Sequence, residues 1–111
     1  MHELAVTQSI LDIALRHAEG KRTTDIQLVM GELAQLVDDS IQFYWDMIAK
    51  DTAAEGATLH FRRVAAEFQC MACFEKYRPG GEQFSCPYCG SVGAKIIAGE
   101  EFFVEAIDVE G

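Results

Sequence analysis

Two Cys-x-x-Cys pairs, Cys70–Cys73 and Cys86–Cys89, constrain the fold of this chain more than any other feature. Each pair spans one tight turn, so its two sulfur atoms can converge on a single ion, and Gly90 tolerates the left-handed conformation that suits such a turn. Four thiolates at this spacing are typical of a tetrahedral zinc site of the ribbon type. Because four protein ligands leave no open position, we expect this zinc to be structural and not catalytic.

Two other states of the cysteines stay open at this point. Disulfides are disfavoured, because no charged segment followed by an apolar run begins the chain, and we therefore expect a cytoplasmic protein in a reducing compartment. Iron is the second alternative, because thiolates also hold iron–sulfur and rubredoxin-like sites. Zinc is the preferred interpretation. Its binding free energy, on the order of 10 kcal/mol or more in small zinc modules, would fold a segment with little core of its own.

The totals of the sequence exclude several classes of function. A chain of 111 residues is one domain, or one domain with a small insert. Acidic residues outnumber basic ones 18 to 9, and the net charge of −9 is the opposite of the basic patch expected of a nucleic-acid-binding protein. No apolar run approaches the roughly 18 residues that a membrane span needs. We therefore expect a protein partner or a cation, with no nucleic acid and no membrane.

Hydrophobic periodicity predicts two helices and three strands outside the cysteine segment. Their predicted ranges, in chain order, are helix 4–19, strand 25–30, helix 39–50, strand 57–64 and, after the cysteines, strand 101–109. The fold class is therefore α+β, a small three-stranded sheet with two helices and an inserted zinc-ribbon-like module that carries the four cysteines. The predicted module covers residues 66–98, between a first part at 1–65 and a returning strand at 99–111.

The same patterns predict details within these elements. Leu4, Leu11, Leu15 and Ala18 are expected on the buried face of the first helix, with Ile10, Ile13 and Ala14 widening this apolar stripe. The stripe of Ile41, Tyr44, Trp45 and Ile48 in the second helix is expected to be core. Asp39 is expected to begin the second helix, with Gln42 as a capping-box-like partner. In the last strand the alternation of apolar residues changes phase, which predicts a bulge near Glu105–Ala106.

The start of the chain, Met1-His2-Glu3, can chelate a metal ion. The terminal amine of Met1 with the amide nitrogen and imidazole of His2 can form fused chelate rings, and the amide or carboxylate of Glu3 can complete a four-coordinate set. Nitrogen-rich square-planar donation suits nickel(II) or copper(II). On chemistry alone this signal is weak, because a histidine near a terminus is usually an ordinary surface residue.

The whole chain resembles the hydrogenase nickel-incorporation protein family, HypA/HybF. The matching motifs are Met1-His2-Glu3, Gly31-Glu32-Leu33, Glu55-Gly56-Ala57 and the double Cys-x-x-Cys before a terminal strand. The resemblance implies a nickel metallochaperone for the maturation of nickel–iron hydrogenase, with nickel as transient cargo around His2 and structural zinc on the four cysteines. It also implies two partners, a nickel-insertion GTPase of the HypB type and the hydrogenase large-subunit precursor.

The chain departs from the family pattern in two places. Many members carry proline where Val64-Ala65-Ala66 lies here, and some carry a histidine near the second cysteine pair, where this chain has none. The acidic Asp38 is more simply explained by a helix N-terminus that favours carboxylates than by a role as an auxiliary nickel ligand. His17 and His60 are predicted to be ordinary surface residues and not metal ligands.

We therefore predict that residues 1–65 and 99–111 form a nickel-binding domain and that the protein is not an enzyme, because no catalytic triad, phosphate-binding loop or open zinc position is evident. Nickel binding is expected to weaken when His2 is protonated near pH ~6. The alternative function is a zinc-ribbon protein–protein adaptor without physiological nickel binding. The sequence leaves the oligomeric state, monomer or homodimer, open.

Overall fold

The computed structural model describes residues 3–80 and 84–111, so Met1 and His2 lie outside the described residues. The chain divides into two compact units. Unit 1 comprises the chain up to Val29, Gln35–Arg62 and Phe102–Gly111, and unit 2 comprises Met30–Ala34 and Arg63–Glu101. The functional division predicted above, with a nickel-binding domain at 1–65 and 99–111 and a zinc module at 66–98, stays a prediction.

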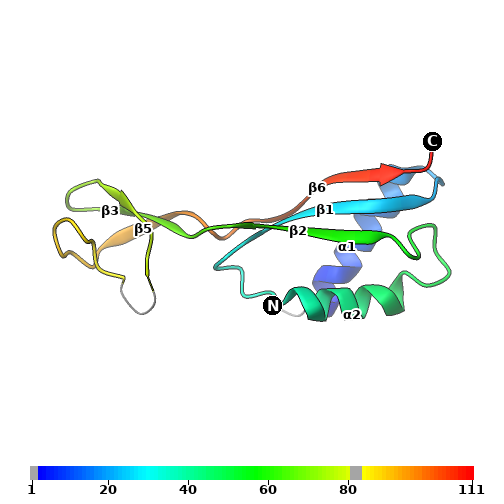
Figure 1. Cartoon of the computed structure of the whole chain (residues 1–111), viewed down its shortest axis with the longest axis horizontal. Helices are drawn as coiled ribbons and strands as arrows, with labels where there is room; N and C mark the ends of the chain where they lie inside the picture. The colour runs from blue at the N-terminus through cyan, green and yellow to red at the C-terminus, as the bar shows by residue number, and fades with distance from the viewer. Residues whose placement is uncertain (1–2, 81–83) are drawn as a thin grey trace. The chain divides into compact units, whose positions relative to one another are not determined.

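Unit 1 is built from a three-stranded sheet and two helices (Figure 1). Strand β1 lies in the middle of the sheet, in the order β2-β1-β6. The elements are α1 (Glu3–Ala18), β1 (Thr23–Gly31), α2 (Asp38–Ile48), β2 (Thr58–Val64) and β6 (Phe102–Val109). This arrangement confirms the predicted α+β fold class, and each predicted range agrees with an observed element to within two residues.

The core of unit 1 is apolar and closely packed. Ile26 and Leu28 of the central strand are fully buried, as are Ile41 and Trp45 of α2. Helix α1 packs against both α2 and β6. The predicted core position of the α2 stripe is confirmed for Ile41 and for Trp45, which is only 1% exposed, whereas Tyr44 and Ile48 are half-buried.

The predicted buried face of α1 is confirmed except at its first residue. Ile10, Leu11, Ala14 and Ala18 are buried as predicted, and the buried stripe begins at Val6. Leu4 is 39% exposed, although the sequence pattern placed it on the apolar face. Leu4 lies in the first turn, immediately after the helix begins, and that turn lies at the margin of the core.

The predicted capping box of α2 is wrong. The N-cap residue is Val37, whose side chain makes no cap hydrogen bond, and the Gln42 amide donates to Asp46 Oδ1 at 2.9 Å. The backbone N–H of Val37 donates instead to Glu3 Oε2 at 3.4 Å, so the acceptor at this helix start comes from α1. Asp39 lies in the first turn, where a carboxylate interacts favourably with the helix dipole.

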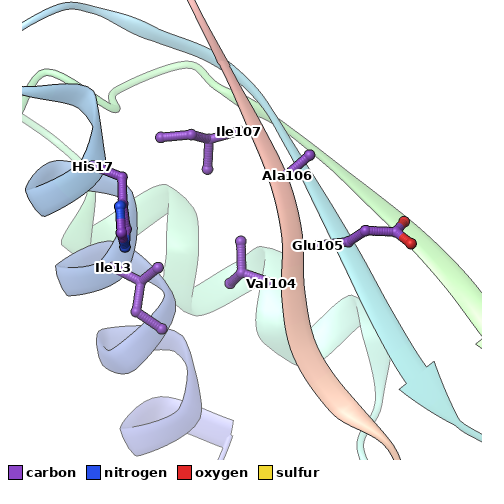
Figure 2. A pocket seen from close by; sticks show the side chains of 6 residues that line it. All are labelled: Ile13, His17, Val104, Glu105, Ala106 and Ile107. Atoms are coloured by element: carbon purple, nitrogen blue, oxygen red, sulfur yellow. The ribbon is translucent and has the colours of Figure 1, made fainter.

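Strand β6 shows the predicted change of phase. Val104 and Ile107 are half-buried, whereas the two residues between them are exposed. Figure 2 shows Val104 and Ile107 pointing toward α1, and Glu105 and Ala106 pointing to the other side of the strand. Because strict alternation would place residues 104 and 107 on opposite faces, an extra residue is accommodated at Glu105–Ala106, as expected of a bulge.

Unit 2 contains a second three-stranded sheet, which the sequence pattern did not predict. Its strands are β3 (Glu67–Cys70), β4 (Lys76–Tyr77) and β5 (Ala94–Ala98), in the order β4-β3-β5. Both pairings are antiparallel, with Phe68 opposite Tyr77 and Cys70 opposite Ala94. Strands of two to five residues are too short to give a clear alternating pattern, which explains why they were missed.

Gly31 has a steric role within unit 2. A Cβ atom at this position would lie 2.0 Å from the carbonyl oxygen of Gly99, so only glycine permits this approach of two backbones. The backbone N–H groups of the Gly31-Glu32-Leu33 motif each donate to a carbonyl oxygen of unit 2. Gly31 donates to Glu101 at 2.6 Å, Glu32 to Val64 at 2.8 Å and Leu33 to Gly99 at 2.7 Å. The Gly31-Glu32-Leu33 motif therefore joins both chain segments that lead into and out of the cysteine segment.

Candidate metal centre

The structure brings all four predicted zinc ligands together. Cys70 ends strand β3, Cys73 follows in the next turn, and Cys86 and Cys89 flank the second turn. Their four sulfur atoms lie within 4.8 Å of one another, and they form the group of candidate metal ligands found among residues 3–80 and 84–111. Cys70 and Cys86 are buried, whereas Cys73 and Cys89 are exposed. One ligand of each pair therefore faces inward and the other faces solvent.

The distances between the sulfur atoms fit a tetrahedral metal ion and not a disulfide. Cys70 Sγ is 3.5 Å from Cys89 Sγ, and Cys73 Sγ is 3.7 Å from Cys86 Sγ. Four sulfurs held about 2.3 Å from a central zinc ion are ~3.8 Å apart, whereas a disulfide bond is about 2.05 Å long. The donor set is therefore spaced for one ion at its centre.

Backbone N–H groups are already directed at the ligand sulfurs. Cys70 Sγ accepts from Ala72 N at 3.3 Å and from Cys73 N at 3.5 Å, and Cys86 Sγ accepts from Tyr88 N at 3.4 Å. Each turn thus aims its own backbone donors at the first cysteine of its pair. Such donors stabilise thiolates, which is the form that binds metal.

The pKa values of Cys70 and Cys73 are shifted in opposite directions. The backbone N–H groups of Cys73 and Ala72 lower the pKa of Cys70 to about 6. At Cys73 a hydrogen bond from the Glu75 backbone lowers the pKa, but desolvation and the thiols of Cys86, Cys70 and Cys89 outweigh it and raise the pKa to about 12. A bound divalent cation would remove this conflict and allow all four sulfurs to be thiolates.

A small aromatic cluster supports the cysteines, and the sequence analysis did not identify it. Tyr77 is buried beside Cys70 and Cys86, and Phe68 packs against this group. The rings of Phe68 and Tyr77 meet edge to face at 5.8 Å, and the Tyr77 hydroxyl donates to the carbonyl of Phe84 at 2.8 Å. The signal in the sequence for this cluster was the presence of aromatic residues before and between the two cysteine pairs. A tyrosine among them can be buried because its hydroxyl usually finds a hydrogen-bond partner.

The two cysteine turns share an unusual backbone feature. The residue after the second cysteine of each pair has a positive φ, 63° at Phe74 and 79° at Gly90. Glycine adopts this conformation without cost, as predicted for the second turn, whereas Phe74 adopts it at a cost on the order of 1–3 kcal/mol. The local fold therefore holds the first turn in a conformation that its sequence disfavours.

The predicted nickel ligands are only partly within the described chain. Met1 and His2 lie outside the described residues, and Glu3 is the first residue of α1. The Glu3 carboxylate is half-buried and accepts the hydrogen bond from Val37 N, so it anchors the beginning of the chain at the start of α2. Of the three proposed ligands, Glu3 is the one that the structure places.

The other histidines lie in exposed positions on unit 1. His60 Nε2 is 2.8 Å from Asp25 Oδ1, on neighbouring strands β2 and β1. His17 lies in the last turn of α1, on the side that faces β6 (Figure 2). Neither belongs to a group of three or more candidate ligands within residues 3–80 and 84–111.

A small α+β fold with four clustered cysteines defines the class of small metal-binding proteins. The chain matches the family model described as "Hydrogenase/urease nickel incorporation, metallochaperone, hypA" over residues 1–109. It therefore belongs to the HypA family, whose members serve nickel incorporation during hydrogenase maturation. The family description is that of a metallochaperone and not of an enzyme, in agreement with the prediction from sequence.

Individual relatives support this assignment. The chain is 40% identical to "Hydrogenase maturation factor HypA" of Dehalococcoides mccartyi strain 195, over 99% of this chain and 95% of the relative. It is 40% identical to a protein of the same name from Caldanaerobacter subterraneus subsp. tengcongensis, over 99% of this chain and all of the relative. Both alignments are close to full length, so the relatives share the whole architecture.

Solved structures of the same fold were also found. The solution structure of the Ni metallochaperone HypA from Helicobacter pylori matches with a TM-score of 0.67 and 18% identity, over 98% of this chain and 97% of the other. A second, described as the solution structure of HypA protein, matches with a TM-score of 0.73 at 18% identity, over 99% of this chain and 97% of the other. Within the described part of the chain, no helix is both long and apolar enough to span a membrane.

Proposed function

We propose that this protein binds nickel(II) at its N-terminus and delivers it, with a GTPase partner of the HypB type, to the hydrogenase large-subunit precursor. The proposed nickel ligands are the Met1 amine, His2 and Glu3. The observation that carries the proposal is the family match over residues 1–109, because it includes the Met1-His2-Glu3 start. We expect this delivery to take place in the cytoplasm, and the oligomeric state, including a homodimer, stays a prediction.

The anchoring of Glu3 supports the proposed position of the nickel site. His2 is covalently adjacent to Glu3, whose carboxylate accepts the hydrogen bond from the start of α2. Asp38 and Asp39, in the first turn of α2, follow directly after Val37, whose backbone N–H donates to Glu3. Their negative charge favours a divalent cation electrostatically.

We further propose that Cys70, Cys73, Cys86 and Cys89 hold a structural zinc ion. Zinc would supply a tetrahedral cross-link between the two cysteine turns, and it would take no part in a reaction, because all four positions are filled by protein. The spacing of the sulfurs and the backbone donors aimed at them support zinc, and four-sulfur iron sites have similar geometry. Metal analysis of the protein as purified separates these two ions directly.

The decisive experiment is isothermal titration of nickel into untagged, zinc-loaded protein. We expect about one nickel per chain for the native protein and none for His2→Ala, with zinc content unchanged in both, because a chelate loses most of its affinity with its imidazole. His60→Ala is the matched control, since it removes an exposed imidazole from another part of unit 1. Equal binding by native protein and His2→Ala would remove the N-terminal site and favour the zinc-ribbon adaptor function.

Delivery needs its own assay, because binding alone does not establish it. Nickel-loaded protein is mixed with a HypB-type GTPase, GTP and the apo large-subunit precursor, and nickel on the precursor is measured after separation. We expect transfer from the native protein and little from His2→Ala. Equal transfer by the two proteins would show that the N-terminus does not carry the cargo.

A further inference from the structure

Helix α1 and strand β6 of unit 1 enclose an apolar groove. One hollow of about 460 Å³ lies between the two elements, and we call its lining residues the α1–β6 groove. They are Val6, Ser9, Ile10 and Ile13 of α1 and Phe102, Phe103 and Val104 of β6. A second hollow of about 320 Å³ continues from Ile13 and Val104 toward His17 and Ile107 (Figure 2). Among the described residues, neither Glu3 nor any of the four cysteines lines either hollow.

The strand that borders this groove lies at the edge of its sheet. In the part of the chain that the structure describes, β6 pairs only with β1. One row of its backbone N–H and C=O groups is therefore available to a further strand, and a strand added there would lie along the outer side of α1. An apolar groove beside an unpaired strand edge is the arrangement that accepts an extended peptide, because backbone bonds supply affinity and the groove takes alternate side chains.

The edge is divided into two unlike halves. The first half, Phe102–Val104, carries no charge, and Phe103 is 46% exposed. The second half is interrupted by the phase change at Glu105–Ala106 and carries Glu105 and Asp108 without any lysine or arginine. Bulges and charges are devices that prevent strand pairing. Pairing is therefore open along the first half and discouraged along the second.

Charge decides which occupant suits this edge. Symmetric antiparallel pairing of two copies centred on Phe103 would place Glu101 opposite Glu105 twice, and like charges directly opposite one another are destabilising. Two copies that each carry a net charge of −9 also repel. A partner segment with lysine or arginine beside its apolar residues would instead place opposite charges beside Glu105. Glu105 already pairs with Arg62 at 3.0 Å in an exposed position, where exchange of partners costs little.

We propose that the β6 edge at Phe102–Val104, together with the α1–β6 groove, binds an extended segment of a partner protein by strand addition. The segment has apolar side chains at alternate positions, which enter the groove, and basic side chains between them, which face Glu105 on the open side of the sheet. This binding does not depend on nickel or on the proposed N-terminal ligands.

The test uses the full, zinc-loaded chain labelled with ¹⁵N and a short capped peptide of alternating valine and lysine. We expect the peptide to shift the backbone amide resonances of residues 102–104. Phe103→Lys should weaken binding about tenfold or more, because it removes an exposed aromatic contact and adds a positive charge that repels the lysines of the peptide. Phe43→Lys is the matched control on α2, where an aromatic ring is 61% exposed away from the groove, and it should leave the affinity unchanged.

A second variant keeps the test valid if Phe103→Lys disturbs the fold. Ser9 lines the groove from α1 and is exposed, and its hydroxyl donates to the Ala5 carbonyl of its own helix. Ser9→Arg should therefore block the groove without loss of structure, whereas Gln8→Arg, at the neighbouring exposed position, should bind the peptide normally.

Three results would overturn the proposal. Equal binding of a backbone N-methylated peptide would exclude strand addition, because that peptide cannot donate to β6. Equal binding of an alternating valine and glutamate peptide would exclude the charge preference. Shifts of residues 102–104 that depend on protein concentration in the absence of peptide would show that a second copy of the chain occupies this edge.

Discussion

The two units of this protein differ in what stabilises each of them internally. Unit 1 has an extended apolar core, in which Ile26, Leu28, Ile41 and Trp45 are fully buried. Unit 2 has a small cluster around Cys70, Tyr77 and Cys86, and two of those three residues are proposed metal ligands. Apolar burial can account for the stability of the first unit, whereas the second needs a cross-link. The predictions below test this contrast, and they run from the largest expected effect to the smallest.

Metal removal should affect the two units unequally. A strong chelator should unfold much of Arg63–Glu101, because a structural zinc site contributes on the order of 10 kcal/mol. The fluorescence of Trp45, which lies in the core of unit 1, should change little. Amide NMR spectra before and after chelation measure both parts at once, and added zinc should restore the spectrum. A large change in Trp45 fluorescence when the metal is removed would show that unit 1 also depends on the metal cross-link between the cysteines.

Trp45→Ala should destabilise unit 1 and leave the metal site of unit 2 unchanged. Removing this ring from the core should lower the free energy of unfolding of unit 1 by roughly 3–5 kcal/mol. Urea denaturation followed by circular dichroism measures the loss, and zinc content should stay the same. Phe43→Ala, on the exposed side of the same helix, should change stability by less than about 0.5 kcal/mol. If Trp45→Ala also releases zinc, the two units are not stabilised independently.

Tyr77→Phe tests the aromatic support of the cysteines. The variant loses the 2.8 Å hydrogen bond to the Phe84 carbonyl but keeps the ring. We expect a loss of about 1 kcal/mol, which is a roughly fivefold weaker zinc affinity in competition with a chelator. Tyr88→Phe is the control, because the ring of Tyr88 is 67% exposed. An equal loss of zinc affinity in both variants would mean that the hydrogen bond from Tyr77 to Phe84 makes no specific contribution to zinc binding.

The pair of His60 and Asp25 should give the smallest effect, because the two side chains are partly exposed, 45% and 34% respectively, and solvent screens their interaction. The hydrogen bond from His60 lowers the pKa of Asp25 below its ordinary value of 3.8. A lowered carboxyl pKa stabilises the folded state above the unfolded pKa, and this contribution is lost as the pH falls through the folded value. Wild type should therefore be slightly more stable than His60→Ala near pH 5, with the difference shrinking below pH ~4.

The control for this pH dependence is His17→Ala, which leaves the bond between His60 and Asp25 intact. Its stability relative to wild type should not change over the same pH interval, with Trp45 fluorescence as the reporter of unit 1. A pH-independent difference for His60→Ala would mean that the Asp25 charge does not contribute.

Local patterns predicted the parts of the fold that depend on near neighbours. The Cys-x-x-Cys spacing predicted that four sulfurs would meet, and the i, i+4 pattern of Ile41 and Trp45 predicted a buried helix face. The phase change at Glu105–Ala106 was visible in the order of apolar residues alone. The short strands of unit 2 and the aromatic support at Tyr77 were missed, because a strand of two residues has no period to detect.

The sequence by itself determined the order of the main helices and strands, the four-cysteine cluster and the membership of the HypA family, because each depends on residue identity at short spacing or on the motifs themselves. Tertiary structure alone decided that Glu3 serves as acceptor at the start of α2, that Gly31 must be glycine beside Gly99, and that β6 lies at a sheet edge beside an apolar groove. The physical reason is distance along the chain. Each of these contacts joins segments tens of residues apart, and only the closed fold brings them together.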